Sequence, residues 1–126
     1  MAVTDKLVES LESRWRRPMV EQMSFAEFAA SVARDAGPPD ELSVPLRALW
    51  HDARGDWAVA HGLAQEDGSE RGAWVHAYLH RKEGDVANAG YWYAKANRSR
   101  PADDVTLRGE WEQIARELLG DVPTRG

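Results

Sequence analysis

The chain has 126 residues, of which 43% are hydrophobic and 29% charged, so it has the size and composition of one globular domain and not those of a disordered chain. Sixteen basic and 21 acidic side chains give a net charge of −5 with no basic stripe, which argues against nucleic acid as a partner. The sequence contains no cysteine, no apolar run of membrane-spanning length and no apolar signal-peptide core near Met1, so we expect no disulfides, no membrane partner and a cytoplasmic location.

Helical periodicity and capping signals predict seven helices, of which the first two lie before a proline-rich linker. Apolar residues recur at helical spacing over residues 4–16, and Pro18 ends that pattern. Ser24 and Glu27 form the signature of a capping box at the start of the second helix. The second helix ends before the linker that begins at Gly37.

The remaining chain is divided by turn signals into five shorter helices. Four of them are expected over residues 46–53, 56–66, 70–83 and 85–97. The last is expected to open at Pro101 and the Asp103–Asp104 pair and to end at Gly120. We therefore predict an N-terminal helical arm over residues 1–37, a helical core with a C-terminal capping helix over residues 43–120, and a frayed tail over residues 121–126.

An internal repeat is visible in the turns of this core. Gly55–Asp56 and Gly84–Asp85 lie 29 residues apart, and each pair combines a left-handed helix end with a helix cap. The same alignment pairs Ala48 with Ala77, His51 with His80, and Ala60 with Ala89. Two tight helix–turn–helix units of similar sequence are therefore predicted.

The two units resemble tetratricopeptide repeats. The second unit has small residues at Ala77 and Ala89, an aromatic residue at Tyr93 and a proline at Pro101, as that pattern requires. The large hydrophobic positions differ, and the period is five residues shorter than usual: arginine or histidine replaces leucine, and histidine replaces tyrosine. The resemblance implies an all-α fold in which two divergent tetratricopeptide-like hairpins are flanked by N- and C-terminal helices.

One stretch resembles a bacterial family of short tetratricopeptide-like helical proteins. Its signature is similar to Ala73-Trp-Val-His-Ala-Tyr-Leu-His-Arg-Lys-Glu-Gly-Asp85, followed by Tyr91-Trp92-Tyr93. The upstream half of the signature is similar to the stretch from Leu49 to His61, so the resemblance covers about residues 46–96. It implies a tetratricopeptide-like fold and a bacterial cytoplasmic setting, and it implies no activity.

Two histidines suggest a metal site. His76 and His80 have the i, i+4 spacing of the zinc ligands in H-E-x-x-H, although Ala77 stands where that motif has its glutamate. The repeat makes His51 the expected third ligand. Other candidates for that place are His61, Asp52 and Glu83. The alternative interpretation is that His76 and His80 fill interior positions and each forms a hydrogen bond with a carboxylate or a carbonyl.

A partner-binding face is the second candidate site. In tetratricopeptide hairpins the first helix lines a concave groove, where Trp74, Tyr78, Arg81 and Lys82 would offer aromatic surface and two cations to an acidic peptide. Trp92 is expected to be the exposed ring of its aromatic triplet and to contact a partner. The alternatives are a solvated helix end around Arg81 and Lys82, and packing of Trp92 against the last helix.

The function expected from these features is a non-enzymatic interaction module without a cofactor. It would bind a protein or peptide partner, or a second copy of itself, on the concave or aromatic face, because repeat folds offer extended surfaces. The alternative is a metal or small-molecule site formed by His51, His76 and His80, with hydrolytic activity as one use of it.

Overall fold

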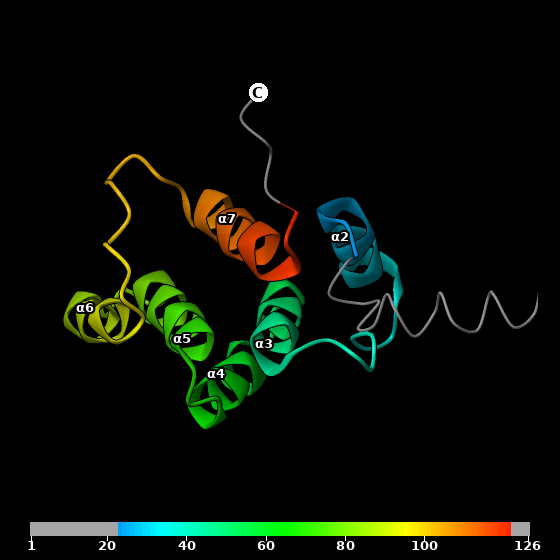
Figure 1. Ribbon diagram of the computed structural model, residues 1–126, viewed down its shortest axis with the longest axis horizontal. Coiled ribbons are helices and arrows are strands. Elements are labelled where there is room, and N and C mark those ends of the chain that lie inside the picture. Colours follow the sequence, from blue (N-terminus) through cyan, green and yellow to red (C-terminus); the bar gives the residue numbers. More distant parts are fainter. Residues whose placement is uncertain (1–22, 122–126) are drawn as a thin grey trace, which may run out of the picture.

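The computed structural model describes residues 23–121, and over that range the chain is all-helical, with six α-helices and no strand (Figure 1). The helices are α2 (Phe25–Arg34), α3 (Val44–Ala53), α4 (Trp57–Glu66), α5 (Glu70–Lys82), α6 (Val86–Lys95) and α7 (Leu107–Leu119). None of these six helices is long and apolar enough to cross a membrane. The helix expected over residues 4–16 lies outside the described residues.

Local capping chemistry sets where the helices begin. The capping box predicted for α2 is confirmed: Ser24 Oγ accepts from the Glu27 amide and the Glu27 carboxylate accepts from the Ser24 amide, both at 3.0 Å. Ser43 and Ser69 cap α3 and α5 in the simpler way, with a hydroxyl that accepts from an amide three residues later.

The two repeated turns have the same backbone geometry. Gly55 and Gly84 adopt φ of +87° and +88°, the left-handed region that favours glycine. The amides of Asp56 and Asp85 each donate to a carbonyl five residues earlier at 2.9 Å, and both side chains then cap the following helix. The 29-residue repeat is therefore expressed in the fold as two matching helix–turn–helix connections.

The prediction for the start of α7 is wrong. Asp103 and Asp104 lie in a turn closed by the hydrogen bond from the Val105 amide to the Ala102 carbonyl at 3.0 Å. The helix begins three residues later, where Thr106 Oγ1 accepts from the Gly109 amide at 2.9 Å. Threonine in this position satisfies an orphan amide of the first turn, which leaves the acidic pair outside the helix.

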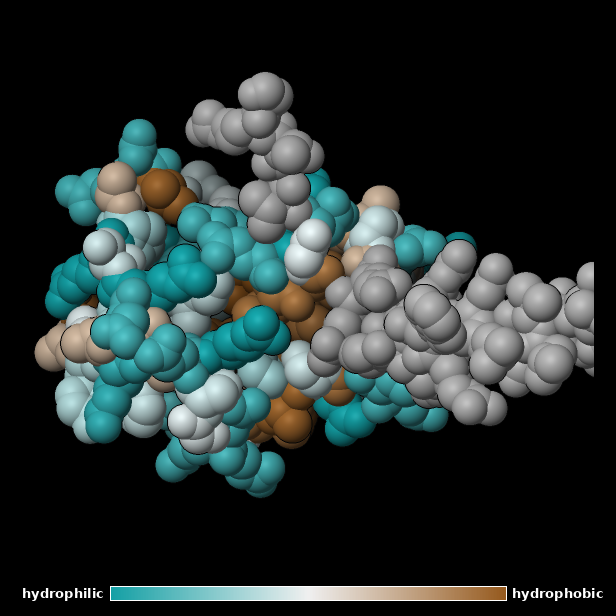
Figure 2. Space-filling model, viewed as in Figure 1, coloured by the Kyte–Doolittle hydropathy of each residue, from teal (hydrophilic) through white to brown (hydrophobic). Residues whose placement is uncertain are grey.

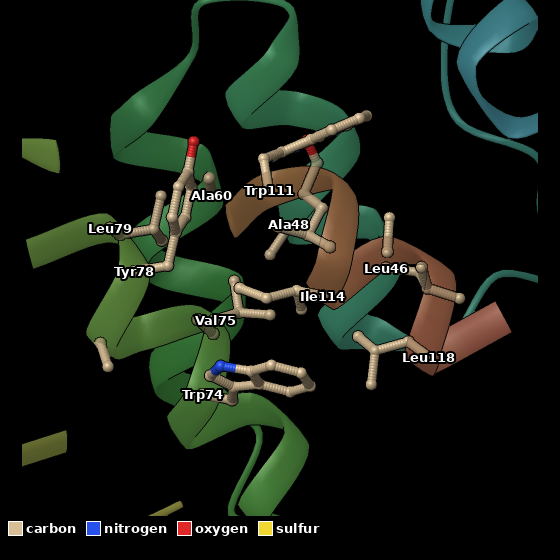
Figure 3. Close-up of a cluster of buried hydrophobic side chains, with 14 of the residues drawn as sticks. Leu46, Ala48, Ala60, Trp74, Val75, Tyr78, Leu79, Trp111, Ile114 and Leu118 are labelled. Atoms are coloured by element: carbon tan, nitrogen blue, oxygen red, sulfur yellow. The ribbon is translucent and has the colours of Figure 1, made fainter. Parts of the chain in front are cut away.

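Consecutive helices from α3 to α6 pack each against the next, and α7 returns across α3 and α5 (Figure 1). The hydrophobic core lies where these elements meet and includes Leu46, Val75 and Ile114 (Figure 3). Helix α5 is the central element, because every residue from Gly72 to His80 is buried. Any polar side chain on that stretch must therefore find its partners inside the protein.

Helix α2 is joined to the core over the described part of the predicted arm. Phe28 is fully buried and stacks on Trp111 of α7 at a centroid distance of 5.7 Å. The Trp50 indole of α3 donates to Ser31 Oγ of α2 at 3.1 Å. Asp121, predicted as the first residue of a frayed tail, accepts from the Phe25 amide at 2.6 Å, while residues 122–126 lie outside the described range.

Candidate functional site

Two buried carboxylates tie the central helix to its neighbours. Asp52 of α3 is 3% exposed and accepts from the Tyr78 hydroxyl at 3.1 Å and from Lys82 Nζ at 2.9 Å. Burial, together with the Asp52 charge, raises the pKa of the Tyr78 hydroxyl far above its usual range. Tyr78 therefore stays a hydrogen-bond donor at any physiological pH.

Glu110 of α7 plays the same part on the next face of α5. It is 2% exposed and accepts from an Arg81 guanidinium nitrogen at 2.9 Å and from the Tyr93 hydroxyl. Arg81 also donates to the Val105 carbonyl. Because its guanidinium is held by these internal partners, Arg81 acts in the fold as a structural cation.

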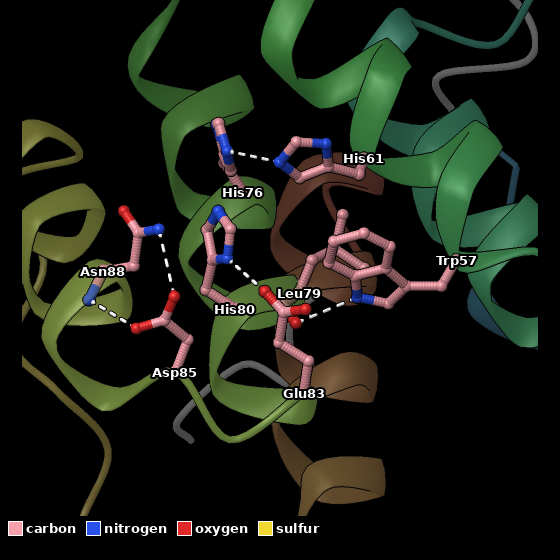
Figure 4. A network of polar contacts seen from close by, with 8 residues as sticks. All are labelled: Trp57, His61, His76, Leu79, His80, Glu83, Asp85 and Asn88. Atoms are coloured by element: carbon pink, nitrogen blue, oxygen red, sulfur yellow. Dashed lines mark hydrogen bonds and ion pairs between the residues drawn. The ribbon is translucent and has the colours of Figure 1, made fainter.

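Three histidines meet where α4 packs against α5 (Figure 4). His61 of α4 and His76 of α5 face one another with their Nε2 atoms 3.0 Å apart. The His80 ring centroid lies 4.8 Å from that of His76 and 5.1 Å from that of His61. One ring nitrogen from each histidine falls within 4.8 Å of the other two, so the three imidazoles converge on one point.

Two indole rings form walls around this histidine cluster, which we define as His61, His76 and His80. Trp57 lies nearly parallel to His61, with centroids 4.7 Å apart and an interplanar angle of 10°. Trp92 of α6 stacks on His76 at 3.9 Å and 18°. The Trp57 indole nitrogen also donates to a backbone carbonyl of α5 at 3.0 Å, which fixes the ring that holds His61.

The remaining ring nitrogens of the two buried histidines differ in their partners. His80 Nδ1 lies 2.6 Å from a Glu83 carboxylate oxygen. His76 Nδ1 is buried and has no hydrogen-bond partner among residues 23–121. The interior role expected of these histidines, a hydrogen bond to a carboxylate or carbonyl, is therefore met by His80 and not by His76.

The electrostatic environment of His61 and His76 disfavours their protonated forms. Burial, together with smaller repulsive contributions from His61 and His80, lowers the pKa of His76 to about 4. Burial and His80 also lower the pKa of His61, against an opposing effect of the Glu83 carboxylate. Neutral imidazoles retain the lone pair with which histidine binds metals.

The structure brings His76 and His80 together with His61, and not with His51. His51 lies on α3, where its ring meets Trp50 edge-on at 5.3 Å. Equivalent residues of successive repeats are separated by the displacement of a whole helical pair, so they point in similar directions without meeting. Helix α4 packs directly against α5, which is why its histidine completes the cluster.

The five predicted partner-binding residues do not share one surface. Trp74 is 5% exposed and is covered by the Arg98 guanidinium, 3.8 Å above its ring. Trp92 is partly buried because it stacks on His76, and Tyr91, 55% exposed, is the open ring of the triplet, contrary to the prediction. Arg81 is engaged with Glu110. Tyr78 and Lys82 line one pocket, described next.

This pocket has a volume of about 400 Å³ and lies between α2, α3, α5 and α7. Its apolar lining includes Val32, Leu107 and Trp111, and Lys82 and Arg108 add two cations. Sequence reasoning missed the contributions of α2 and α7, because it treated α2 as a separate arm and α7 as a cap. The regular apolar stripe of α7, which includes Trp111, was the available signal that this helix packs on the core.

Comparison of the chain with protein-family models, with curated proteins and with solved structures gives no match. The function is therefore inferred from the side chains themselves.

Proposed function

We propose that the chain is a non-enzymatic interaction module that binds a peptide segment carrying an apolar side chain next to a carboxylate. The observation that carries the proposal is the pocket between α2, α3, α5 and α7, in which an apolar lining meets two cationic side chains. At about 400 Å³ it lies within the size range of protein ligand pockets. A pocket of this volume can hold one or two apolar side chains of a bound peptide.

The lining of this pocket favours an amphipathic occupant. Leu107 is 36% exposed, while Trp111 is 6% exposed and supplies a rigid aromatic wall with low entropic cost on binding. An apolar side chain placed against these residues would be removed from water. Figure 2 shows hydrophobic side chains gathered near the middle of the viewed face and bordered by hydrophilic ones.

The two cations of the pocket differ in how free they are. Lys82 already binds the buried Asp52, although its side chain remains 38% exposed. Arg108 is exposed and forms no ion pair with any residue of the described range 23–121. A guanidinium can hold a carboxylate through two parallel hydrogen bonds, so Arg108 is the proposed anchor for the acidic group.

A tetratricopeptide-like arrangement supports the same proposal. We infer that α3–α4 and α5–α6 are two divergent hairpins, because their turns share a left-handed glycine and a capping aspartate. In that arrangement α3 and α5 are the first helices of their hairpins, and residues from both line the pocket. Such helices form the binding groove in repeat proteins of this kind.

The test uses a displayed library of random peptides selected against the wild-type chain and then compares variants. Arg108→Glu reverses the charge at the pocket, and Arg71→Glu makes the same change at an exposed position outside its lining. We expect the selected peptides to combine apolar and acidic residues and to bind Arg108→Glu at least about 10-fold more weakly, a difference of about 1.4 kcal/mol. Arg71→Glu should bind them as the wild type does.

Lys82 is not suited to this test, because its replacement would leave the buried Asp52 carboxylate without its cation. Failure to select any peptide, or selection of peptides that bind both variants equally, would contradict the proposed site.

A further inference from the structure

The histidine cluster takes no part in the proposed peptide pocket, which lies on another side of α5. We propose that His61, His76 and His80 form a binding site for one divalent transition-metal ion of the Zn²⁺ type, with a coordination position left open. The site is independent of the interaction function proposed above, because none of the three histidines lines that pocket.

The spacing of the ring nitrogens fits such an ion. Two nitrogens bound to Zn²⁺ at about 2.0–2.1 Å in tetrahedral geometry lie roughly 3.3 Å from one another. The Nε2 atoms of His61 and His76 are 3.0 Å apart, and His80 brings a nitrogen within 4.8 Å of both. Small side-chain movements would therefore place all three nitrogens at bonding distance from one ion.

The three rings are held in place by groups around them. Trp57 and Trp92 stack on His61 and His76, which limits rotation of those two rings. His80 is oriented through its Nδ1 by Glu83 at 2.6 Å, and Figure 4 shows its other nitrogen directed toward the neighbouring histidines. A carboxylate behind a ligating imidazole fixes its tautomer and raises its basicity, as in many zinc sites.

A purely structural role explains these residues less well. A buried histidine that serves packing is normally satisfied by hydrogen bonds at its polar atoms. His76 instead directs its Nε2 at the Nε2 of a second imidazole, and its Nδ1 has no partner in the described chain whether or not Nε2 binds an ion. Two neutral imidazoles that face one another share a single hydrogen, which is a weak reason to bring the rings together, whereas a cation would use a lone pair from each of the three histidines.

The chemistry of the ligands selects the kind of ion. Imidazole nitrogen suits Zn²⁺, Cu²⁺, Ni²⁺ and Co²⁺, while Mg²⁺ and Ca²⁺ require oxygen ligands. Glu83 is engaged with His80 and orients that ring instead of supplying a fourth ligand. Because His61 is only half-buried, the fourth position is open to water or to a small anion.

The experiment titrates chelator-treated protein with Zn²⁺ by calorimetry and repeats the titration with Co²⁺, whose visible spectrum reports tetrahedral coordination. The variants are His61→Gln and, as the matched control, His51→Gln, which changes a histidine outside the cluster. We expect one Zn²⁺ per chain, and a rise in Tm of roughly 10–20 °C at a free Zn²⁺ concentration 100 times Kd. His61→Gln should weaken binding by more than about 100-fold, the upper limit for a group that only orients a ligand.

Glu83→Gln is a second variant in case His61→Gln fails to fold, because Glu83 is exposed and touches the cluster only through His80. We expect it to weaken Zn²⁺ binding by about 10–100-fold with an unchanged circular dichroism spectrum. The proposal is overturned if wild-type protein binds no Zn²⁺ and shows no thermal shift. It is equally overturned if Zn²⁺ binds the His61→Gln and Glu83→Gln variants as it binds the wild type, or if His51→Gln is the variant that loses it.

Discussion

Single buried polar residues decide how the helices of this small domain are fixed to one another. Glu110 joins α7 to α5 through Arg81 and to α6 through Tyr93, all within a low-dielectric interior. A buried carboxylate that loses one donor keeps its desolvation penalty, so such networks are sensitive to single changes. The surface tyrosine two positions away, Tyr91, provides a direct comparison because its hydroxyl has no such role in the described network.

Tyr93→Phe removes the hydroxyl that donates a hydrogen bond to Glu110 and leaves the ring in place. We expect the free energy of unfolding to fall by about 1.5–3 kcal/mol, the range for hydrogen bonds to charged groups. Tyr91→Phe, at a residue that is 55% exposed, should change it by less than about 0.5 kcal/mol. Urea denaturation followed by tryptophan fluorescence measures both, and equal stability of the two variants would show that Glu110 does not depend on Tyr93.

His76 makes the metal-free protein sensitive to acid. Its folded-state pKa of about 4 lies below the ordinary 6.5, so between these values the unfolded chain binds more protons and stability rises with pH. The groups that face it are His61 from α4, His80 on its own helix and the uncharged Trp92 from α6. The contribution of His76 to the unfolding free energy is therefore fully present above its unfolded-state pKa, and it is lost as the pH falls toward its folded-state pKa.

In the presence of a chelator, the wild type should lose up to about 2 kcal/mol of unfolding free energy between pH 7 and pH 5 through this histidine. His76→Phe keeps an aromatic ring against Trp92 and has no titrating group at that position. As the pH falls from 7 to 5, the unfolding free energy of this variant should therefore rise by a similar amount relative to that of the wild type. Urea titrations at both pH values measure the difference. A constant difference between the two proteins would contradict the assignment.

At the scale of the elements, the glycines of the repeated turns and Gly62 inside α4 have opposite roles. Gly84 ends α5 at φ +88° with open space around its Cα, so any cost of a side chain there arises from the backbone. Gly62 lies inside α4, also in open space, and the structure makes no use of its freedom. A helix with glycine at such an interior position is less stable than the same helix with alanine there.

Gly84→Ala should destabilise the protein by about 1–2 kcal/mol, and Gly55→Ala by a similar amount, because the two turns share one conformation. Gly62→Ala should stabilise it by about 0.5–1 kcal/mol. Thermal unfolding of the three variants measures the signs directly. A stabilising Gly84→Ala change would mean that the left-handed turn is not required.

For the molecule as a whole, the features that depend on neighbours in sequence were predictable and those that depend on distant segments were not. The capping box at Ser24 and the turns at Gly55 and Gly84 follow from a few adjacent residues, and the structure confirms them. The third member of the histidine cluster depends on which helices touch, and the repeat alignment compares equivalent positions without giving their contacts. His61 was only one of several candidates for that reason.

The candidate binding face shows the same limit. A helical pattern says which residues share a face of α5, but this helix is contacted by α3, α4, α6 and α7, so each of its faces meets a different neighbour. Lys82 opens onto the pocket while Arg81, the next residue back, is held by Glu110. Nothing in the sequence near these residues indicates which of the two cations lines the pocket and which pairs with Glu110.

The hydrogen bond between the Phe25 amide and Asp121 joins residues 96 positions apart, and it has a consequence for synthesis on the ribosome. Helix α2 is made first among the described helices, yet its main contacts are with α7, which is made last. At about 5–20 residues per second, the apolar face of α2 waits roughly 5–20 s for its partner. During that interval Phe28 has no completed site to enter, so among the described helices α2 is the one most in need of protection from aggregation.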